Sequence, residues 1–350
     1  MGYSALGFKE ILVRLEDDSV AVVTINRASH FSLGLVNELI RIFELVDKDD
    51  RVRVVILTAD PTAPAFCAGA DLSRGWNGLS RDEKPSDFRD PGGRVAMAVH
   101  NCRKITISAV NGHAAGAGVT ALQLPFDFRF VWSGAKITLP FIRRGVTPES
   151  LSSLLLPRLI GLSRAKALLL TGATVQPNSP HIQGLYHEVL PTREEVFPAS
   201  LSFAKELAAN TSQVSIAYAK GLLHHPGDTV EETFLLESRA LAEASKSRDA
   251  EELTRAFFER RRPNLKDTVS KNMPEWYPWA LSGIEDMVYA PKLLLLQSSS
   301  ISRIANVYQC TLGQWHTSIF LSQKTGQPHA MRFGPSEAWL ILLLPPTHKL

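Results

Sequence analysis

Glu149 is the residue whose type and setting best suit proton transfer in this chain of 350 residues. Thr147 and Pro148 precede it and predict a helix over residues 148–160, with Thr147 as N-cap and Pro148 as the first helical residue. A carboxylate in a first helical turn stabilises the helix by up to about 1 kcal/mol, and this structural role is one interpretation. The other is a general base, which needs apolar surroundings to raise its pKa.

Two segments rich in small residues can bring backbone amides close to a ligand. Residues 66–72 (FCAGADL) follow a predicted buried strand, and residues 110–118 (VNGHAAGAG) follow another strand and open a predicted helix. Free N–H groups at such places can point at a ligand, and an oxyanion beside the Ala117 N–H would be stabilised. Tight turns and close helix–strand packing need the same residue types, so a purely steric role is the alternative. The second segment lacks the GxGxxG spacing of dinucleotide-binding loops.

Composition excludes several classes of protein. The net charge of +3 does not favour nucleic-acid binding. Cys67, Cys102 and Cys310 are far apart without a CxxC pair, which argues against a disulfide framework or a zinc site. We expect no signal peptide and no membrane span, because no apolar run reaches about 20 residues.

The elements that must position these segments alternate between strand and helix. Short apolar runs predict strands, and apolar residues at helical spacing predict helices. This alternation predicts an α/β layer fold with ligands at the carboxyl ends of the strands. Strands are predicted within residues 8–26 (two), 52–59, 104–110 and 127–132, and helices at 33–46 and 93–103.

From residue 148 onward the pattern is mainly helical, and after residue 265 prolines interrupt it. We divide the chain into a core over residues 8–200, a helical region over 201–265 and an appendage over 266–350 whose order the pattern does not define. Helices are predicted near 148–160, 163–171, 193–209, 213–223, 229–245 and 250–260, with one strand at 186–190.

Four motifs in order resemble the crotonase (enoyl-CoA hydratase/isomerase) superfamily over about residues 8–265. They are the AGAD loop, the NG-x-x-x-G-x-G segment, the stretch GVTPESLSSLLLP and the late segment EELTRAFFERRRP. The resemblance implies a crotonase-type ββα spiral with a C-terminal helical trimerisation region. It also implies an acyl-CoA substrate whose thioester oxygen is held by the backbone amides of Ala68 and Ala117. The second position is usually Gly in the family.

Departures from the family pattern narrow the implied reaction. Hydratases of the family use two glutamates, and Thr120 and Phe141 stand at those positions. Glu149 falls where peroxisomal Δ3,Δ2-enoyl-CoA isomerases carry one catalytic glutamate, so isomerisation of 3-enoyl-CoA to 2-enoyl-CoA is the expected activity. The same stretch resembles fungal enoyl-CoA hydratase/isomerases, some of them in toxin biosynthesis clusters. An enoyl-CoA hydratase and a non-catalytic CoA-binding protein are the alternatives.

The resemblance also implies partners and further binding residues. Coenzyme A enters as part of the substrate, and no separate cofactor and no metal are expected. A homotrimer or dimer of trimers is expected, and Asp127 resembles a buried structural aspartate of the family. The ending His348-Lys349-Leu350 resembles a peroxisomal address, so we expect recognition by a peroxisomal import receptor, or else a cytoplasmic protein. The candidate CoA-binding residues are Arg27, Ala68, Gly69, Ala70, Asp71, Leu72, Gly116 and Arg260.

Overall fold

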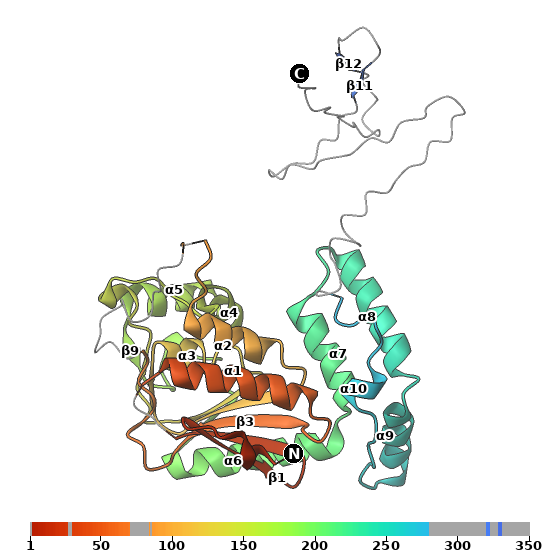
Figure 1. Cartoon of the computed structure of the whole chain (residues 1–350), viewed down its shortest axis with the longest axis horizontal. Helices are drawn as coiled ribbons and strands as arrows, with labels where there is room; N and C mark the ends of the chain where they lie inside the picture. The colour runs from red at the N-terminus through yellow and green to blue at the C-terminus, as the bar shows by residue number, and fades with distance from the viewer. Residues whose placement is uncertain are drawn as a thin grey trace. The chain divides into compact units, whose positions relative to one another are not determined.

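The computed structural model describes residues 2–26, 30–70, 84 and 86–279, together with two short strands nearer the C-terminus. The chain divides into two units, Met1–Glu275 and Trp276–Leu350. In the second unit, β11 (Phe320–Ser322) pairs antiparallel with β12 (Pro328–Ala330). The first unit carries the elements that the sequence predicts (Figure 1).

The larger sheet of the first unit has six strands in the order β1-β2-β3-β5-β7-β10. β1 and β2 form an antiparallel hairpin, and the following neighbours pair in parallel. Every residue of β3 and β5 is buried, as expected for parallel strands covered on both faces. The predicted strands are confirmed as β1 (Ile11–Glu16), β2 (Val20–Ile25), β3 (Val54–Ala59), β5 (Ile105–Val110), β7 (Phe128–Trp132) and β10 (Glu188–Leu190).

A second sheet of four short strands, in the order β4-β6-β8-β9, is absent from the sequence-based prediction. Its strands are only two or three residues long, so they carry no periodic pattern. β4 and β6 are parallel, as are β6 and β8, whereas β9 is antiparallel to β8. The strands are β4 (Ala65–Cys67), β6 (His113–Ala115), β8 (Ile137–Thr138) and β9 (Thr174–Val175).

The two sheets are built by a repeated strand–strand–helix order. In each repeat the first strand joins the larger sheet, the second joins the smaller sheet, and a helix follows. The repeats are β3-β4-α2, β5-β6-α3 and β7-β8-α4, with α2 at Pro91–His100, α3 at Ala117–Thr120 and α4 at Ser152–Ile160. This is a mixed α/β fold with a parallel sheet, as predicted.

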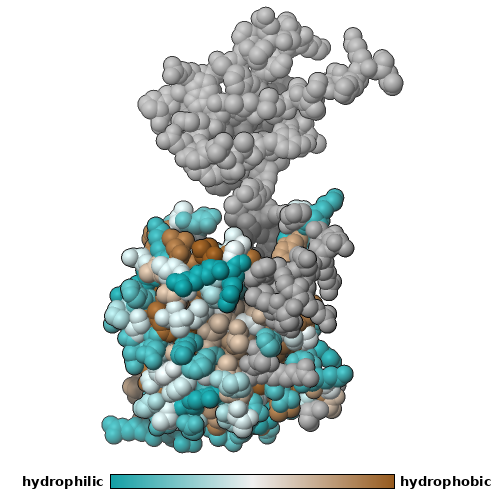
Figure 2. All heavy atoms as spheres, turned by 90° about the vertical axis from the view of Figure 1, so that its left-hand side faces the viewer, coloured by the Kyte–Doolittle hydropathy of each residue, from teal (hydrophilic) through white to brown (hydrophobic). Residues whose placement is uncertain are grey.

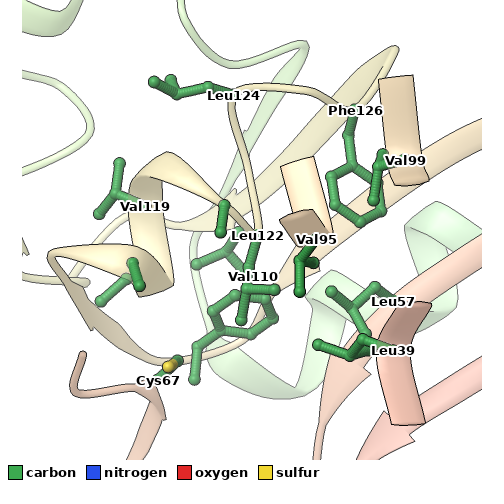
Figure 3. Packing of buried hydrophobic residues seen from close by; sticks show 14 of the residues in the cluster. Leu39, Leu57, Cys67, Val95, Val99, Val110, Val119, Leu122, Leu124 and Phe126 are labelled. Carbon is green, nitrogen blue, oxygen red and sulfur yellow. The ribbon is translucent and has the colours of Figure 1, made fainter. Parts of the chain in front are cut away.

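The core lies between these repeats and α1 (Leu33–Lys48), which the sequence also predicts. The Ser32 side chain caps α1 by accepting a hydrogen bond from the Leu35 amide, and the buried face of the helix then packs on the sheet. Figure 3 shows Leu39 of α1 beside Leu57 of β3, with Val95 and Val99 of α2 in the same cluster. The cluster extends to Cys67, so the small sheet is anchored in the core.

The remaining helices follow the second sheet. α6 packs against β3, β5 and β7 on the other face of the larger sheet. α6 continues across residue 200, where the sequence analysis places the end of the core. Residues 266–275, assigned there to the appendage, belong to the first unit, and Ser270 among them hydrogen-bonds to Asp50. The helices are α5 (Leu162–Thr171), α6 (Arg193–Asn210), α7 (Gln213–His224), α8 (Val230–Ala244), α9 (Arg248–Glu259) and α10 (Val269–Asn272).

Large apolar side chains also lie on the surface. Figure 2 shows a face of mixed hydropathy with hydrophobic residues gathered near its upper end. Leu154 of α4 and Leu162 and Leu170 of α5 are exposed, as are Phe257 and Phe258 of α9. Within the described part of the chain, no helix has the length and apolar character to cross a bilayer.

Candidate functional site

The carboxyl ends of β4 and β6 bring the two small-residue segments together. β4 ends at Cys67, directly before Ala68, and β6 ends at Ala115, two residues before Ala117. A Cβ at Gly69 would lie 2.8 Å from the Ala115 carbonyl oxygen. One at Gly118 would lie 2.9 Å from the Cys67 Cβ. The two loops therefore touch, and glycine at these positions allows the close approach.

Ala68 and Ala117 differ in burial, but both amides lack a backbone acceptor in the described part of the chain. Ala68 is exposed, whereas Ala117 is buried. Neither N–H group donates a backbone hydrogen bond among the described residues. The sequence predicts that the dipole of a helix beginning at Ala117 would help to stabilise an anion there. α3 has only four residues, so its dipole is weak and adds little to that stabilisation. Stabilisation of an anion here depends on the N–H groups themselves.

Arg193, at the start of α6, links the segments that lead into both loops. Its guanidinium donates to the carbonyl of Asn111 at 2.7 Å and to that of Ala63 at 2.6 Å. Asn111 precedes β6 and Ala63 precedes β4, so one side chain fixes the spacing of the two strands. The guanidinium also lies 5.7 Å from the centre of the Trp132 ring. No sequence motif indicates this role, because the two acceptors are backbone carbonyl groups.

Glu149 lies in a turn and not in a helix, which corrects the prediction for residues 148–160. α4 begins at Ser152, and Leu151 stands at its N-cap position. Ser150 and Leu151 both have positive φ values, 56° and 61°, which a continuing right-handed helix forbids. Thr147 and Pro148 therefore do not start the helix, and the dipole of α4 does not act on Glu149 as a first-turn residue.

Two hydroxyl groups hold the Glu149 carboxyl group. Thr120 donates from its Oγ1 to Oε1, and Ser150 donates from its Oγ to Oε2. Thr120 stands where the resemblance implies the first hydratase glutamate, so Glu149 reaches that position from a different segment. Phe141, at the second such position, is buried and apolar.

The surroundings of Glu149 favour its neutral form. Burial, the largest cause, raises its pKa to about 7, although the hydroxyl groups of Ser150 and Thr120 act in the opposite direction. The Asp90 carboxyl group raises the pKa further, through a hydrogen bond and through like charge. No Lys, Arg or His forms an ion pair with Glu149 among residues 30–70 and 86–279.

Asp90 is a site residue that sequence reasoning missed. It is the N-cap of α2, where its side chain accepts a hydrogen bond from the Gly93 amide. Its local sequence, Asp-Pro-Gly-Gly, is typical of a helix start. Only the fold places it beside a carboxyl group 59 positions further along the chain.

The remaining predicted residues are distributed unevenly. Gly69, Ala70 and Gly116 lie in the two loops, and Gly69 and Gly116 have positive φ values of 91° and 52°. Arg27, Asp71 and Leu72 lie outside the described residues. Arg260 is exposed at the end of α9, which Figure 1 shows on the other side of the first unit from α3. The described residues include no cluster of His, Cys, Asp or Glu suited to a metal ion.

Comparison with known proteins identifies the same architecture elsewhere. Residues 16–268 match the family model described as enoyl-CoA hydratase/isomerase. The chain is 36% identical to the enoyl-CoA hydratase AFT3-1 of Alternaria alternata over 281 residues, which cover 79% of this chain and 93% of that protein. It is also 36% identical to the enoyl-CoA hydratase ACTT3 of the same organism, over 74% of this chain and 86% of that protein.

A solved structure gives the same result. The crystal structure of a probable enoyl-CoA hydratase/isomerase from Mycobacterium abscessus superposes with a TM-score of 0.67 and 34% sequence identity. The match covers 74% of this chain and 99% of that one. The chain therefore belongs to the enoyl-CoA hydratase/isomerase (crotonase) family of acyl-CoA enzymes.

Proposed function

We propose that this enzyme converts a 3-enoyl-CoA into the 2-enoyl-CoA, with Glu149 as the base that moves the proton. One observation carries the proposal. Glu149 is a partly buried carboxyl group without a cationic partner in the described residues, and it contacts Thr120 in the segment that also holds Ala117. A carboxyl group with a pKa of about 7 suits general acid–base catalysis near neutral pH.

The reaction needs one base and a stabilised enolate. Glu149 takes a proton from C2 of the acyl group, the double bond moves, and the same carboxyl group returns the proton to C4. Meanwhile the thioester oxygen carries the negative charge. The Ala68 and Ala117 amides would each stabilise that oxyanion by about 3 kcal/mol. Both oxygens of Glu149 already accept hydrogen bonds from hydroxyl groups. These bonds orient the carboxyl group so that it can remove the proton from C2 directly.

Coenzyme A forms part of the substrate in this proposal. The thioester supplies the carbonyl group that the amides polarise, so neither a separate cofactor nor a metal is needed. Binding of the CoA moiety is assigned to Arg27, Ala68, Gly69, Ala70, Asp71, Leu72, Gly116 and Arg260, with Arg260 reaching the CoA of a neighbouring subunit in the assembly proposed below.

Hydration of a 2-enoyl-CoA is the second candidate, and one observation favours it. Asp90 supplies a second carboxyl group beside Glu149, although neither hydratase motif position holds one. Two carboxyl groups can hold and deprotonate a water molecule. Asp90 and Glu149 could therefore replace the two glutamates that hydratases of the family use. The two Alternaria alternata relatives are also named enoyl-CoA hydratases.

Purified enzyme offered 3-enoyl-CoA and 2-enoyl-CoA separately distinguishes the candidates. We expect the first substrate to be isomerised and Glu149→Gln to lower turnover at least about 100-fold. Glu188→Gln, which changes an exposed carboxyl group on β10, serves as the control and should retain activity. Hydration without isomerisation would establish the second candidate. Full activity of Glu149→Gln would contradict both.

We further propose a homotrimer or a dimer of trimers that forms through the C-terminal helices. Val230, Phe234 and Leu241 of α8 and Phe257 and Phe258 of α9 expose large apolar side chains, which argues for a covering partner. Light scattering of the purified protein tests this, and a monomer would contradict it.

The ending His348-Lys349-Leu350 supports import into the peroxisome by its receptor, with the cytoplasm as the alternative location. A fluorescent protein fused to the N-terminus, with and without the last three residues, tests this. Import that persists without those residues would contradict the assignment.

A further inference from the structure

Asp90 and Glu149 come from distant parts of the chain and meet at the first turn of α2. The carboxyl group of Glu149 and the hydroxyl group of Ser150 press against Gly92 so closely that a Cβ there would overlap both. Asp90 stands two residues earlier, fixed by its hydrogen bond from the Gly93 amide. A Cβ at Gly93 would overlap the Asp90 Oδ2, so the Asp90 and Glu149 carboxyl groups lie over neighbouring residues of the same helical turn.

Two carboxyl groups in contact cannot both ionise without a large electrostatic cost. Among the described residues, the groups that face Glu149 are Asp90 at the start of α2, Thr120 of α3 and Ser150 of its own turn. Of these only Asp90 is ionisable. With no cation paired to Glu149 in the described residues, the favourable arrangement is one proton held between the two carboxyl groups.

We propose that Asp90 is a positioning residue that acts through Glu149, by sharing one proton with it so that the site can both give and take a proton. This inference rests on the proposed function, which it deepens by assigning a second carboxyl group to the acid–base unit. In isomerisation the pair gains the C2 proton and releases it at C4.

In hydration the protons also balance. Glu149 takes a proton from water as the water oxygen bonds to C3, and the proton that the pair held goes to C2. The product has gained one water molecule, and the pair again holds one proton. The same unit therefore serves both candidate reactions without any further reactant.

A purely structural role for Asp90 makes a different prediction. As an N-cap it only needs an oxygen that accepts from the Gly93 amide, and Asn and Ser provide one. Asp90→Asn and Asp90→Ser thus keep the cap and remove the carboxyl group. If capping is the whole role, neither variant will change the titration of Glu149.

Infrared difference spectroscopy of the full-length protein between pH 5 and pH 9 can follow this titration directly. The band of Glu149 is identified by its loss in Glu149→Gln. We expect its midpoint to fall by about one pH unit in both Asp90→Asn and Asp90→Ser, because the like charge and the shared proton are gone. An unchanged midpoint, or a wild-type protein without a carboxyl band that titrates in this range, overturns the inference.

Activity provides an independent second readout. In the same variants the acid limb of the pH–rate profile should move to lower pH in parallel with the infrared midpoint. Because the infrared result needs no substrate, it decides the role of Asp90 even if no enoyl-CoA is turned over. That failure would count against the proposed function alone.

Discussion

Two partly buried carboxyl groups at different places in the fold have opposite surroundings. Asp127 precedes β7, where its Oδ2 accepts from the Lys220 ammonium group at 2.7 Å and from the Thr106 amide at 2.7 Å. Lys220 also donates to the Lys104 carbonyl at 2.8 Å. Glu149, near the carboxyl ends of the short strands, is held by hydroxyl groups and another carboxyl group, with no ion pair in the described residues.

The presence or absence of a paired cation distinguishes a carboxyl group that stabilises the fold from one that is available for chemistry. A carboxylate that is fully paired ties elements together, and here it joins β5, β7 and α7. A carboxyl group left without a cation stays close to the balance between its charged and neutral forms. Burial without a cationic partner in the described residues is therefore the feature on which the proposed role of Glu149 in proton transfer rests.

The largest effect is expected from removing the cation that pairs with Asp127. Lys220→Met leaves a mostly buried carboxylate without its cation, so we expect the free energy of unfolding to fall by about 3 to 5 kcal/mol. Urea unfolding at pH 7 measures this. Adding Asp127→Asn to that variant should recover part of the loss. A loss below about 1 kcal/mol would mean that the pair is no more than a surface ion pair.

Steric pressure on the Glu149 side should have a smaller effect on stability but a clear one on turnover. The methyl group of Gly92→Ala would occupy the space of the Glu149 carboxyl and Ser150 hydroxyl groups. We expect about 1 to 3 kcal/mol of destabilisation and turnover at least about tenfold lower. Gly34→Ala in α1 is the control, because its new Cβ meets neighbours only at an ordinary 3.4 Å. Unchanged turnover in Gly92→Ala would show that Glu149 can move freely.

Removing the charge of Glu149 should stabilise the fold in a pH-dependent way. Its pKa is about 7 in the folded protein against an ordinary value of 4.5. Below pH 4.5 Glu149 is protonated in both the folded and the unfolded protein, so its burial does not lower the free energy of unfolding. As the pH rises toward 7 the unfolded state ionises first, so stability falls and stays low above pH 7.

Glu149→Gln should therefore gain about 1 to 3 kcal/mol of stability at pH 8 and little at pH 4.5, by thermal or urea unfolding. Equal changes at both pH values would contradict an uncompensated buried acid.

The smallest effect is expected at Thr120, whose hydroxyl group favours the charged form of Glu149. Thr120→Val removes this donor, so the pKa of Glu149 should rise by less than about one unit and stability should fall by about 1 kcal/mol. The acid limb of the pH–rate profile reports the shift. Thr120→Ser keeps the hydroxyl group and should behave like the wild type. A shift toward lower pH in the valine variant would contradict the assignment.

Much of the fold followed from the sequence pattern because its main elements are long. The larger sheet and helices such as α1 and α6 have continuous or periodic apolar residues, and their positions were predicted within a few residues. The smaller sheet was missed, since strands of two or three residues have no period. That sheet nevertheless aligns the loops of Ala68 and Ala117.

The candidate site was only partly predictable for a related reason. The motifs of Glu149 and of both loops indicate them as candidates, but the same pattern predicts helix where the structure has a turn before α4. Nothing in the residue types alone requires the left-handed backbone at Ser150 and Leu151. Asp90 was missed because its local pattern explains it completely as a helix cap. Its contact with Glu149 depends on the packing of α2 against the turn.

The left-handed pair at Ser150 and Leu151 also limits how this enzyme can be altered. Each residue is held in a conformation that costs an L-amino acid roughly 1 kcal/mol, and together they reverse the chain between the acid and α4. The reach of Glu149 is thus determined by a bend of fixed length. Insertions or deletions between residues 149 and 152 would move the Glu149 carboxyl group away from Thr120, whereas exposed positions of α4 such as Leu154 remain open to engineering.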